Sequence, residues 1–487
     1  MSKINIRWGW FLGIAICGSS IWSTNCAFAQ IIPDGTLPNN SSVTKDGNIF
    51  NITGGTQAGS NLFHSFQEFS VPTGGTAIFN NAANIQNIIS RVTGGSVSNI
   101  DGLIRANGTA NLFLINPNGI IFGQNAQLNI GGSFVGTTAN AVQFGNIGFF
   151  SATAKNIPSP LLTINPSALL FNQINQNAVI QNNSVAFAGT DRAGFNALGL
   201  RVPDGKSLLL VGGNVSMDGG RLNASGGRVE LGGLAQAGTV ALGVDSDSLS
   251  LRFPDNVART DISLTNQAAI YVEGAGGGNI AANAKNVEIL GGSVLSAGIG
   301  QGLGTPETVT GDITLNATGE IKLDGGSVVS NTVQTGSLGN GGNITLDNGG
   351  NITIYSLSLS LQDGAGNIQD GAGNIDTKVV QSCNAGGNLA KNSFTITGRG
   401  GLPPNPGEAL NTDAVKVDLI TLNPNNDRPD RPYFTSKTTT PAREPIIEAT
   451  GLTLNQKGEV MLTANLPITT PHSPWLKPAS CRTIRNS

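Results

Sequence analysis

Few residues in this chain are of a type that performs acid–base or metal chemistry. Only 12% of its 487 residues are charged, and its two histidines are His64 and His472. A strand-rich protein that cleaves polysaccharides would need clustered carboxylates beside Arg or Lys, or bound calcium. The aspartates instead stand repeatedly before glycine, where an Asp side chain bonds the local backbone of a turn. Clear examples are Asp34, Asp46, Asp101, Asp204 and Asp218.

Neither histidine has the neighbours of a catalytic or metal-binding group. His64 lies beside Phe63 and close to Phe66, a setting typical of a packed side chain. The sequence offers no Ser–His–Asp set and too few His and Cys residues for a metal site. We therefore expect no catalytic residue, no metal and no cofactor. A secreted polysaccharide lyase or glycosidase is the alternative function, because fold alone does not decide function.

The first residues predict a Sec-type signal peptide. Lys3 and Arg7 precede an apolar stretch over residues 8–21, and residues 27–29 read Ala-Phe-Ala, a small-x-small cleavage pattern. The apolar stretch is shorter than the ~20 residues of a spanning helix. We expect cleavage before Gln30 and a mature chain without a transmembrane helix. The mature protein would then be secreted or held at the cell surface.

The four cysteines divide between the two parts of the chain. Cys17 and Cys26 leave with the signal peptide, so the mature chain keeps Cys383 and Cys481 in a compartment that permits disulfides. These two can form one disulfide. Two unrelated thiols are the alternative, because spacing in sequence does not show whether the Cα atoms come within bridging distance.

Composition favours an elongated repeat protein. Glycine accounts for 67 residues while aromatic residues make up only 5%, as expected for short strands joined by many tight turns. The net charge of −3 provides no basic surface for nucleic acid or an anionic membrane.

Glycine motifs recur at a fixed spacing. Thr-Gly-Gly or its close variant begins at Thr53, Thr73 and Thr93, and the two offsets are equal (73 − 53 = 20 and 93 − 73 = 20). Within residues 211–233, glycine pairs begin at Gly212, Gly219, Gly226 and Gly232, and apolar residues alternate with polar ones between them. Three short strands per coil predict a triangular, right-handed parallel β-helix of roughly 20 residues per coil, stabilised by stacking of coils.

A looser repeat follows the regular one. Gly-Asn-Ile or Gly-Asp-Ile occurs at residues 278–280, 311–313, 342–344 and 350–352 and predicts strands opened by a turn residue. The duplicated segments 363–369 and 370–376 have the Gly and Asp content of calcium-binding repeats. They lack the order of those repeats, which favours turn chemistry over calcium.

The composition changes near Ser393, after which prolines interrupt any regular coil. We expect the β-helix to end here. Residues 452–454 and 460–462 flank a polar turn and predict a hairpin in a C-terminal cap.

The most distinctive motif is a sharp turn between two apolar strands. Its residues are Asn116, Pro117, Asn118, Gly119 and Ile120. Pro presets φ and Gly tolerates positive φ, so the motif predicts a corner of the coil.

In its context this motif resembles the filamentous haemagglutinin N-terminal domain, which defines two-partner secretion exoproteins. The similarity covers residues 32–141 and includes residues 61–66 and 128–134. One departure is the absence of the family's Asn-Pro-Asn-Leu signature, where this chain has Asn81-Ala82-Ala83-Asn84-Ile85. Further stretches resemble the version common in cyanobacteria, namely residues 162–171, 202–210 and 397–404.

The resemblance implies a route of export and a partner. The mature chain would cross the periplasm unfolded, be captured by the periplasmic domains of an outer-membrane β-barrel transporter, and fold as it emerges. Residues 116–120 would be the secretion motif. An adhesin or surface-structure protein is the favoured role, with glycans or cell surfaces as ligands. The tail is too short and too rich in proline to be a toxin effector.

These observations predict four segments. They are a signal peptide (1–29), a filamentous haemagglutinin-type secretion domain (30–200), a β-helix repeat region (201–392) and a Pro-rich C-terminal region or cap (393–487).

Overall fold

A computed structural model describes residues 30–245, 248–305, 307–323, 325–334 and 337–338, and beyond these the strands alone. Every regular element among the described residues is a β-strand. None of the described residues forms a helix able to cross a membrane. The predicted signal peptide, the duplicated segments except for residues 375–376, and Cys383 and Cys481 lie outside the described residues.

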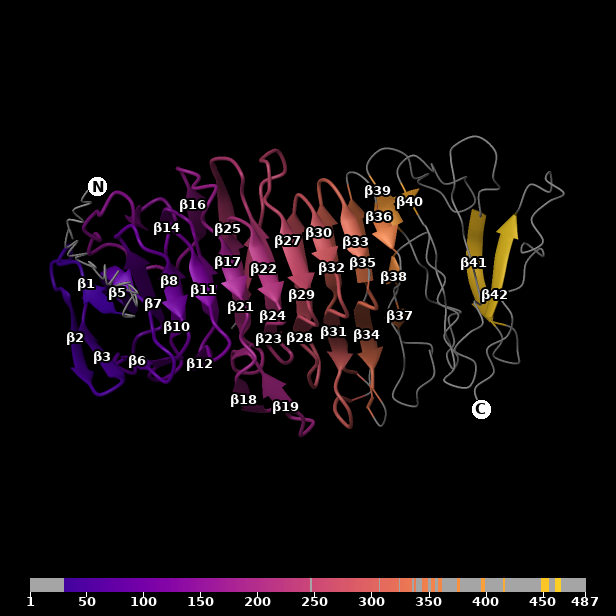
Figure 1. Cartoon of the computed structure of the whole chain (residues 1–487), viewed down its shortest axis with the longest axis horizontal. Helices are drawn as coiled ribbons and strands as arrows, with labels where there is room; N and C mark the ends of the chain where they lie inside the picture. The colour runs from indigo at the N-terminus through magenta and orange to yellow at the C-terminus, as the bar shows by residue number, and fades with distance from the viewer. Residues whose placement is uncertain are drawn as a thin grey trace, which may run out of the picture.

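Strands from successive coils stack in parallel into three faces and form an elongated solenoid (Figure 1). One coil comprises β7 (Asn87–Val92), β8 (Ser98–Ile100) and β9 (Leu103–Ala106), one strand on each face. Each strand pairs with its counterpart one coil away, as Leu112 does with Ile88. The predicted triangular parallel β-helix is confirmed.

The first face is the longest sheet, with 13 strands. All its pairings are parallel except those of β1 and β4 with β5, which close the N-terminal end of the solenoid. Besides β7 it contains β1 (Ile31–Pro33), β4 (Thr56–Ala58), β5 (Asn61–Phe69), β10 (Asn111–Ile115), β13 (Phe134–Thr137), β21 (Ser207–Gly212), β24 (Arg228–Gly233), β29 (Asn279–Ala284), β32 (Ile313–Ala317), β35 (Ile344–Asn348), β38 (Ile375–Asp376) and β39 (Ile396–Gly398).

The second face is a parallel sheet of short strands. Besides β8 it contains β11 (Ile120–Phe122), β17 (Ile180–Asn182), β22 (Val215–Asp218), β27 (Ile262–Thr265), β30 (Val287–Ile289), β33 (Ile321–Leu323), β36 (Ile352–Ile354) and β40 (Val415–Lys416).

The third face is divided into two sheets between β12 and β20. The first sheet begins with the antiparallel pair β2–β3, which caps the solenoid beside β1. It contains β2 (Ser41–Asp46), β3 (Ile49–Gly54), β6 (Thr76–Phe79), β9 and β12 (Gln127–Asn129), and the second contains β20 (Leu200–Arg201), β23 (Arg221–Asn223), β28 (Ala269–Tyr271), β31 (Val294–Ile299), β34 (Val328–Val333) and β37 (Ser358–Ser360).

The coils differ in length. The stacked pair Leu208 and Val229 gives a coil length of 229 − 208 = 21, whereas the stacked pair Ile280 and Ile313 gives 313 − 280 = 33. The repeat region 211–233 therefore indicated the local coil length well, because its glycine pairs are the corners. Gly219 and Gly226 there have φ of 70° and 63°.

The three Thr-Gly-Gly motifs do not stack on one another. Thr53 lies in β3 on the third face, Thr73 lies just before β6, and Thr93 directly follows β7 on the first face. Their constant spacing is therefore not the coil length at the N-terminal end, where the stacked pair Ile88 and Leu112 gives 112 − 88 = 24.

The first face is apolar on both sides in the N-terminal half. Leu62 and Leu112 point into the solenoid, while Phe63 and Phe113 belong to a second apolar core outside it. An antiparallel covering sheet packs over this outer core, so the strands read as continuous apolar runs. The covering sheet consists of β14 (Ala141–Phe144), β15 (Gly148–Ser151), β16 (Ala168–Phe171), β25 (Gly238–Asp245) and β26 (Ser248–Arg252).

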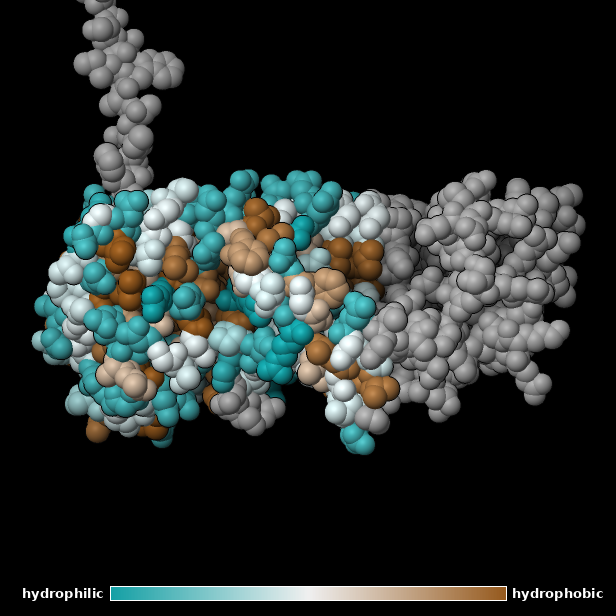
Figure 2. Space-filling view, turned by 90° about the horizontal axis from the view of Figure 1, so that it is seen from below, coloured by the Kyte–Doolittle hydropathy of each residue, from teal (hydrophilic) through white to brown (hydrophobic). Residues whose placement is uncertain are grey.

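Two hairpins complete the described elements. The hairpin of β18 (Phe187–Thr190) and β19 (Asn196–Leu198) projects from the solenoid (Figure 1). The predicted C-terminal hairpin is confirmed as β41 (Glu448–Leu454) paired with β42 (Val460–Asn465). On the face shown in Figure 2, hydrophobic residues form separate patches among hydrophilic ones over the described part of the chain.

Candidate export site at the N-terminal coils

The Asn116–Ile120 motif forms the corner between β10 and β11, as predicted. The backbone N–H of Gly119 donates to the carbonyl oxygen of Asn116 at 3.1 Å, which closes the turn. Gly119 has φ of 121°, and a Cβ there would lie 3.0 Å from the carbonyl oxygen of Val179. A residue with a side chain would be strained at this position.

The two asparagine side chains of the corner bind the preceding coil. Asn116 is fully buried, and its Nδ2 donates to the carbonyl oxygen of Ser96 at 3.0 Å and to Ser98 Oγ at 2.9 Å. Asn118 Nδ2 donates to the carbonyl oxygen of Gly94 at 2.7 Å. Asn116 Oδ1 in turn accepts from the backbone N–H of Asn118 at 3.0 Å. The motif therefore joins two coils through side-chain amides.

A second set of asparagines forms a ladder along the first face. Asn61, Asn87 and Asn111 stack in register on successive coils. Asn87 Nδ2 donates to Asn61 Oδ1, and Asn111 Nδ2 donates to Asn87 Oδ1, both at 2.9 Å. Asn111 Oδ1 then accepts from the backbone N–H of Ser133 at 2.8 Å. Sequence reasoning missed this ladder, although each asparagine is followed by two apolar residues at similar spacing.

The ladder also holds the loop that precedes β16. Asn61 Nδ2 donates to the carbonyl oxygens of Leu162 and Ile164 at 2.8 and 2.7 Å. Asn87 Nδ2 donates to Asn165 Oδ1 at 3.0 Å. Segments far apart in the sequence are thus tied together at the outer core.

Arg91 in β7 is the largest fully buried side chain of the described residues. Its Nη1 donates to the carbonyl oxygens of Ser151 and Asn156 at 2.7 and 2.8 Å. The guanidinium carbon lies 4.2 Å from the centre of the Phe150 ring. Burial lowers the pKa of Arg91 to about 10, and the charge of Asp34 opposes this shift.

The Asp34 carboxylate accepts hydrogen bonds from hydroxyl groups of three segments. It accepts from Ser65 Oγ at 2.7 Å, from Thr93 Oγ1 at 2.5 Å and from Thr36 Oγ1 at 2.8 Å. Burial alone would raise the pKa of Asp34, but these bonds outweigh it and hold the pKa below its usual value. The predicted turn role is confirmed, since Asp34 Oδ1 accepts from the backbone N–H of Thr36 at 3.0 Å. Sequence reasoning missed its connection to Arg91.

His64 is a packed side chain, as predicted. It is buried beside Phe66 and Phe79, and its Nδ1 lies 3.0 Å from Ser41 Oγ. Burial lowers the pKa of the imidazole to about 3. The ring therefore stays neutral at physiological pH.

The remaining described aspartates singled out from sequence do not converge on one site. Asp101 accepts from the backbone N–H of Asn125 at 2.9 Å. Burial alone would raise the pKa of Asp101, but the hydrogen bonds from Thr73 and Asn125 outweigh it and lower the pKa. Asp204 pairs with an arginine on the β18–β19 hairpin, and Asp218 accepts from Asn266 at 2.5 Å. Across the described residues, no three His, Cys, Asp or Glu side chains are grouped so that they could hold a metal ion.

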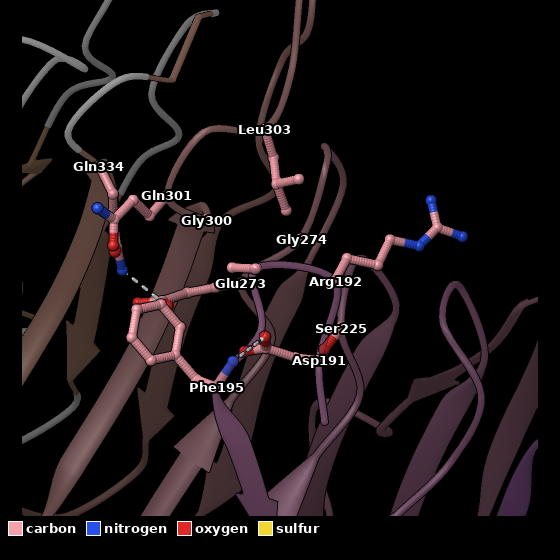
Figure 3. A pocket seen from close by; sticks show the side chains of 11 residues that line it. Asp191, Arg192, Phe195, Ser225, Glu273, Gly274, Gly300, Gln301, Leu303 and Gln334 are labelled. Carbon is pink, nitrogen blue, oxygen red and sulfur yellow. Dashed lines mark hydrogen bonds between the residues drawn. The ribbon is translucent and has the colours of Figure 1, made fainter. Parts of the chain in front are cut away.

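One shallow pocket brings two carboxylates together (Figure 3). Asp191 lies in the turn of the β18–β19 hairpin and Glu273 follows β28. Glu273 accepts from Ser296 Oγ and, at 2.8 Å, from Gln334 Nε2. Burial raises the pKa of Glu273, the bonds from Ser296 and Gln334 oppose this, and the charge of Asp191 adds to the rise.

These features define a parallel β-solenoid whose N-terminal coils are closed by an antiparallel cap and overlaid by a covering sheet. The TPS secretion domain matches residues 29–282, more than half of the chain. The chain belongs to this family and is a two-partner secretion exoprotein. Proteins with this domain are secreted across the outer membrane with the help of a partner transporter, which places this chain outside the cell or on its surface.

Three individual proteins are similar over parts of the chain. The heme/hemopexin-binding protein of Haemophilus influenzae is 32% identical over 120 residues, which are 23% of this chain and 12% of that protein. The chain thus spans about an eighth of that relative. The HMW1 secretion domain of Haemophilus influenzae is 19% identical with a TM-score of 0.49, covering 82% of this chain and 84% of that one. The filamentous hemagglutinin secretion domain is 16% identical with a TM-score of 0.40, covering 71% and 99%.

Proposed function

We propose that this protein is an adhesin or surface-structure protein that an outer-membrane β-barrel transporter exports after recognising its N-terminal coils with periplasmic domains. Family membership supports the route. The hydrogen bonds of Arg91 support a mechanism in which folding outside the cell makes export irreversible. They join the cap near Thr36, the first-face strands and the loop at Asn156.

This network can close only when residues 34–156 are all outside the membrane. A charged side chain buried without its partners is strongly unfavourable, so the cap, the coils and the covering sheet must form together. Once formed, the folded cap resists being drawn back through the transporter. Folding outside the cell would in this way make export proceed in one direction.

Several finer points belong to the same proposal. The signal peptide is cleaved before Gln30, the chain is of the cyanobacterial type, and residues 116–120 act as the secretion motif. The mature protein acts without catalysis and binds glycans or cell surfaces. We divide the mature chain into three domains, at the predicted boundaries 30–200, 201–392 and 393–487.

Deletion of the partner transporter tests the export proposal. We expect the protein to accumulate in the periplasm with its mature N-terminus at Gln30, as measured by cell fractionation and N-terminal sequencing. A periplasmic enzyme with its own signal peptide serves as the control for leakage. Protein found outside deletion cells with intact outer membranes would contradict the proposal.

A deletion strain lacking only this protein tests the adhesive role. We expect weaker attachment to abiotic surfaces or to other cells, restored by expressing the protein from a plasmid. Unchanged attachment in both assays would leave the export proposal standing and remove the adhesive one.

A further inference from the structure

The shallow pocket beside the β18–β19 hairpin, here called the hairpin notch, runs along the solenoid axis. Its floor comes from the ends of third-face strands in successive coils, at Ser225, Glu273, Gly300 and Gln334. Strands of neighbouring coils lie about 4.8 Å apart, so four coils span about 14 Å. The residues that line the notch therefore follow the solenoid axis, the direction in which an extended chain would lie.

The side chains of the notch have the chemistry that binds sugars. Phe195 at the tip of the hairpin is 53% exposed, which leaves an aromatic surface for the C–H groups of a pyranose ring. Asp191 and Glu273 are strong acceptors for hydroxyl groups, and the amides of Gln301 and Gln334 can both donate and accept. Figure 3 shows Phe195 and Glu273 on the same side of the notch.

Part of the floor carries no side chains. Gly274 and Gly300 line the notch, and a Cβ on Gly274 would lie 2.5 Å from the backbone nitrogen of Gly226. The backbone of the neighbouring coil therefore leaves no room for a side chain on Gly274, and the floor stays free of side chains at this point.

The charge of the notch selects against acidic ligands. Among the described lining residues Arg192 is the single cation, and its guanidinium points away from the notch (Figure 3). It pairs with Asp204, with Nε 2.6 Å from Oδ2. The carboxylates of Asp191 and Glu273 thus face the notch without a neutralising charge from Arg192.

We propose that the hairpin notch binds a linear, uncharged oligosaccharide, with Phe195 packing on one sugar ring and Asp191, Glu273 and Gln334 bonding its hydroxyl groups. This inference rests on the proposed role as a surface-binding protein and adds the site and the class of ligand. Sialylated, sulfated and uronic acid-containing glycans are excluded by the two carboxylates.

Purified mature protein, incubated with a panel of soluble tetrasaccharides, tests this assignment. The panel contains neutral oligomers of glucose, galactose, mannose and N-acetylglucosamine, together with sialylated and uronate oligomers. We expect saturation-transfer NMR to detect a neutral member and none of the acidic ones. Phe195→Ala should weaken that binding by about tenfold, since a stacked aromatic anchor is lost.

The control variant is Phe187→Ala, which removes an aromatic of the same hairpin that is 58% exposed and lies outside the notch. It should leave binding unchanged, whereas Glu273→Gln should weaken it and admit acidic glycans. Absence of binding to every neutral member, equal binding of acidic members, or equal effects of the two Phe variants would overturn the inference. Export of the wild-type protein is measured in parallel, so that a normally exported protein that binds no neutral oligomer overturns the sugar-binding notch and leaves the export proposal standing.

Discussion

Arg91 and Asp34 are linked through two hydroxyl groups. Arg91 Nε donates to Ser65 Oγ at 2.8 Å, and Ser65 Oγ donates to Asp34 Oδ2 at 2.7 Å. Arg91 Nη2 donates to Thr36 Oγ1 at 2.8 Å, and Thr36 Oγ1 donates to Asp34 Oδ1 at 2.8 Å. The guanidinium of a fully buried arginine is thus hydrogen-bonded to the cap, the first face and the covering sheet.

Arg91→Ala should destabilise the mature protein by about 3 kcal/mol, because the hydroxyls of Ser65 and Thr36 and two backbone carbonyls lose their donor. Urea unfolding followed by circular dichroism measures the loss. Arg105→Ala, on the exposed side of β9, is the matched control and should change stability by under about 0.5 kcal/mol. Equal stability of the two variants would show that the network contributes nothing.

Asn116→Ala should reduce secretion more than Asn165→Ala. Asn116 is fully buried with two donor bonds to the previous coil, whereas Asn165 is exposed and accepts one bond from Asn87. The lost bonds should also cost about 1–3 kcal/mol of stability. Immunoblotting of culture supernatants measures secretion.

Asn111→Ala separates folding from recognition in the same assay. It removes a half-buried side-chain amide bond of the ladder, outside residues 116–120. Secretion that falls in proportion to stability in both variants would mean that Asn116 serves the fold alone. A larger loss for Asn116→Ala at equal stability is the outcome we expect of a secretion motif.

Gly119→Ala should destabilise the corner by about 1–3 kcal/mol, because φ is 121° and the new Cβ would lie 3.0 Å from the carbonyl oxygen of Val179. Gly95→Ala is the control, since Gly95 lacks positive φ and has open space around its Cβ position. Thermal unfolding of both variants measures the difference. A control as unstable as Gly119→Ala would argue against the strain.

His64 should make stability fall with acid. Its folded pKa of about 3 lies below the ordinary 6.5, so between these values the unfolded chain binds the proton and the folded chain does not. Stability is therefore fully present above pH 6.5 and is lost by up to about 1.4 kcal/mol per pH unit below it. Urea unfolding of wild type and His64→Gln between pH 4 and 7 measures the slope. The variant should lack it, and an equal slope in both proteins would contradict the assignment.

Cys383 and Cys481 remain a sequence-based prediction. A bond between them would close a loop of roughly 98 residues (481 − 383 = 98) and restrain the unfolded chain by roughly 4–5 kcal/mol. Peptide mapping of secreted protein without reduction should yield one crosslinked peptide. Two separately alkylated cysteines would end the idea.

The sequence by itself determined the repeating architecture. Glycine pairs such as those at Gly219 and Gly226 mark corners, and the Asn116–Ile120 turn between apolar strands marks another. Short alternating stretches between them leave a parallel solenoid as the fold that buries their apolar residues. These features are local, because turn conformation and strand alternation depend on residues a few positions apart.

Only the tertiary structure decided which segments meet across long stretches of chain. Coil length varies, so spacing did not predict that Asn61, Asn87 and Asn111 stack, nor that Thr53 and Thr73 do not. The outward Phe63 and Phe113 are covered by strands much further along the chain, and Arg91 finds partners at Thr36 and Asn156. Such contacts depend on how insertions fold back over the coils, which no local pattern encodes.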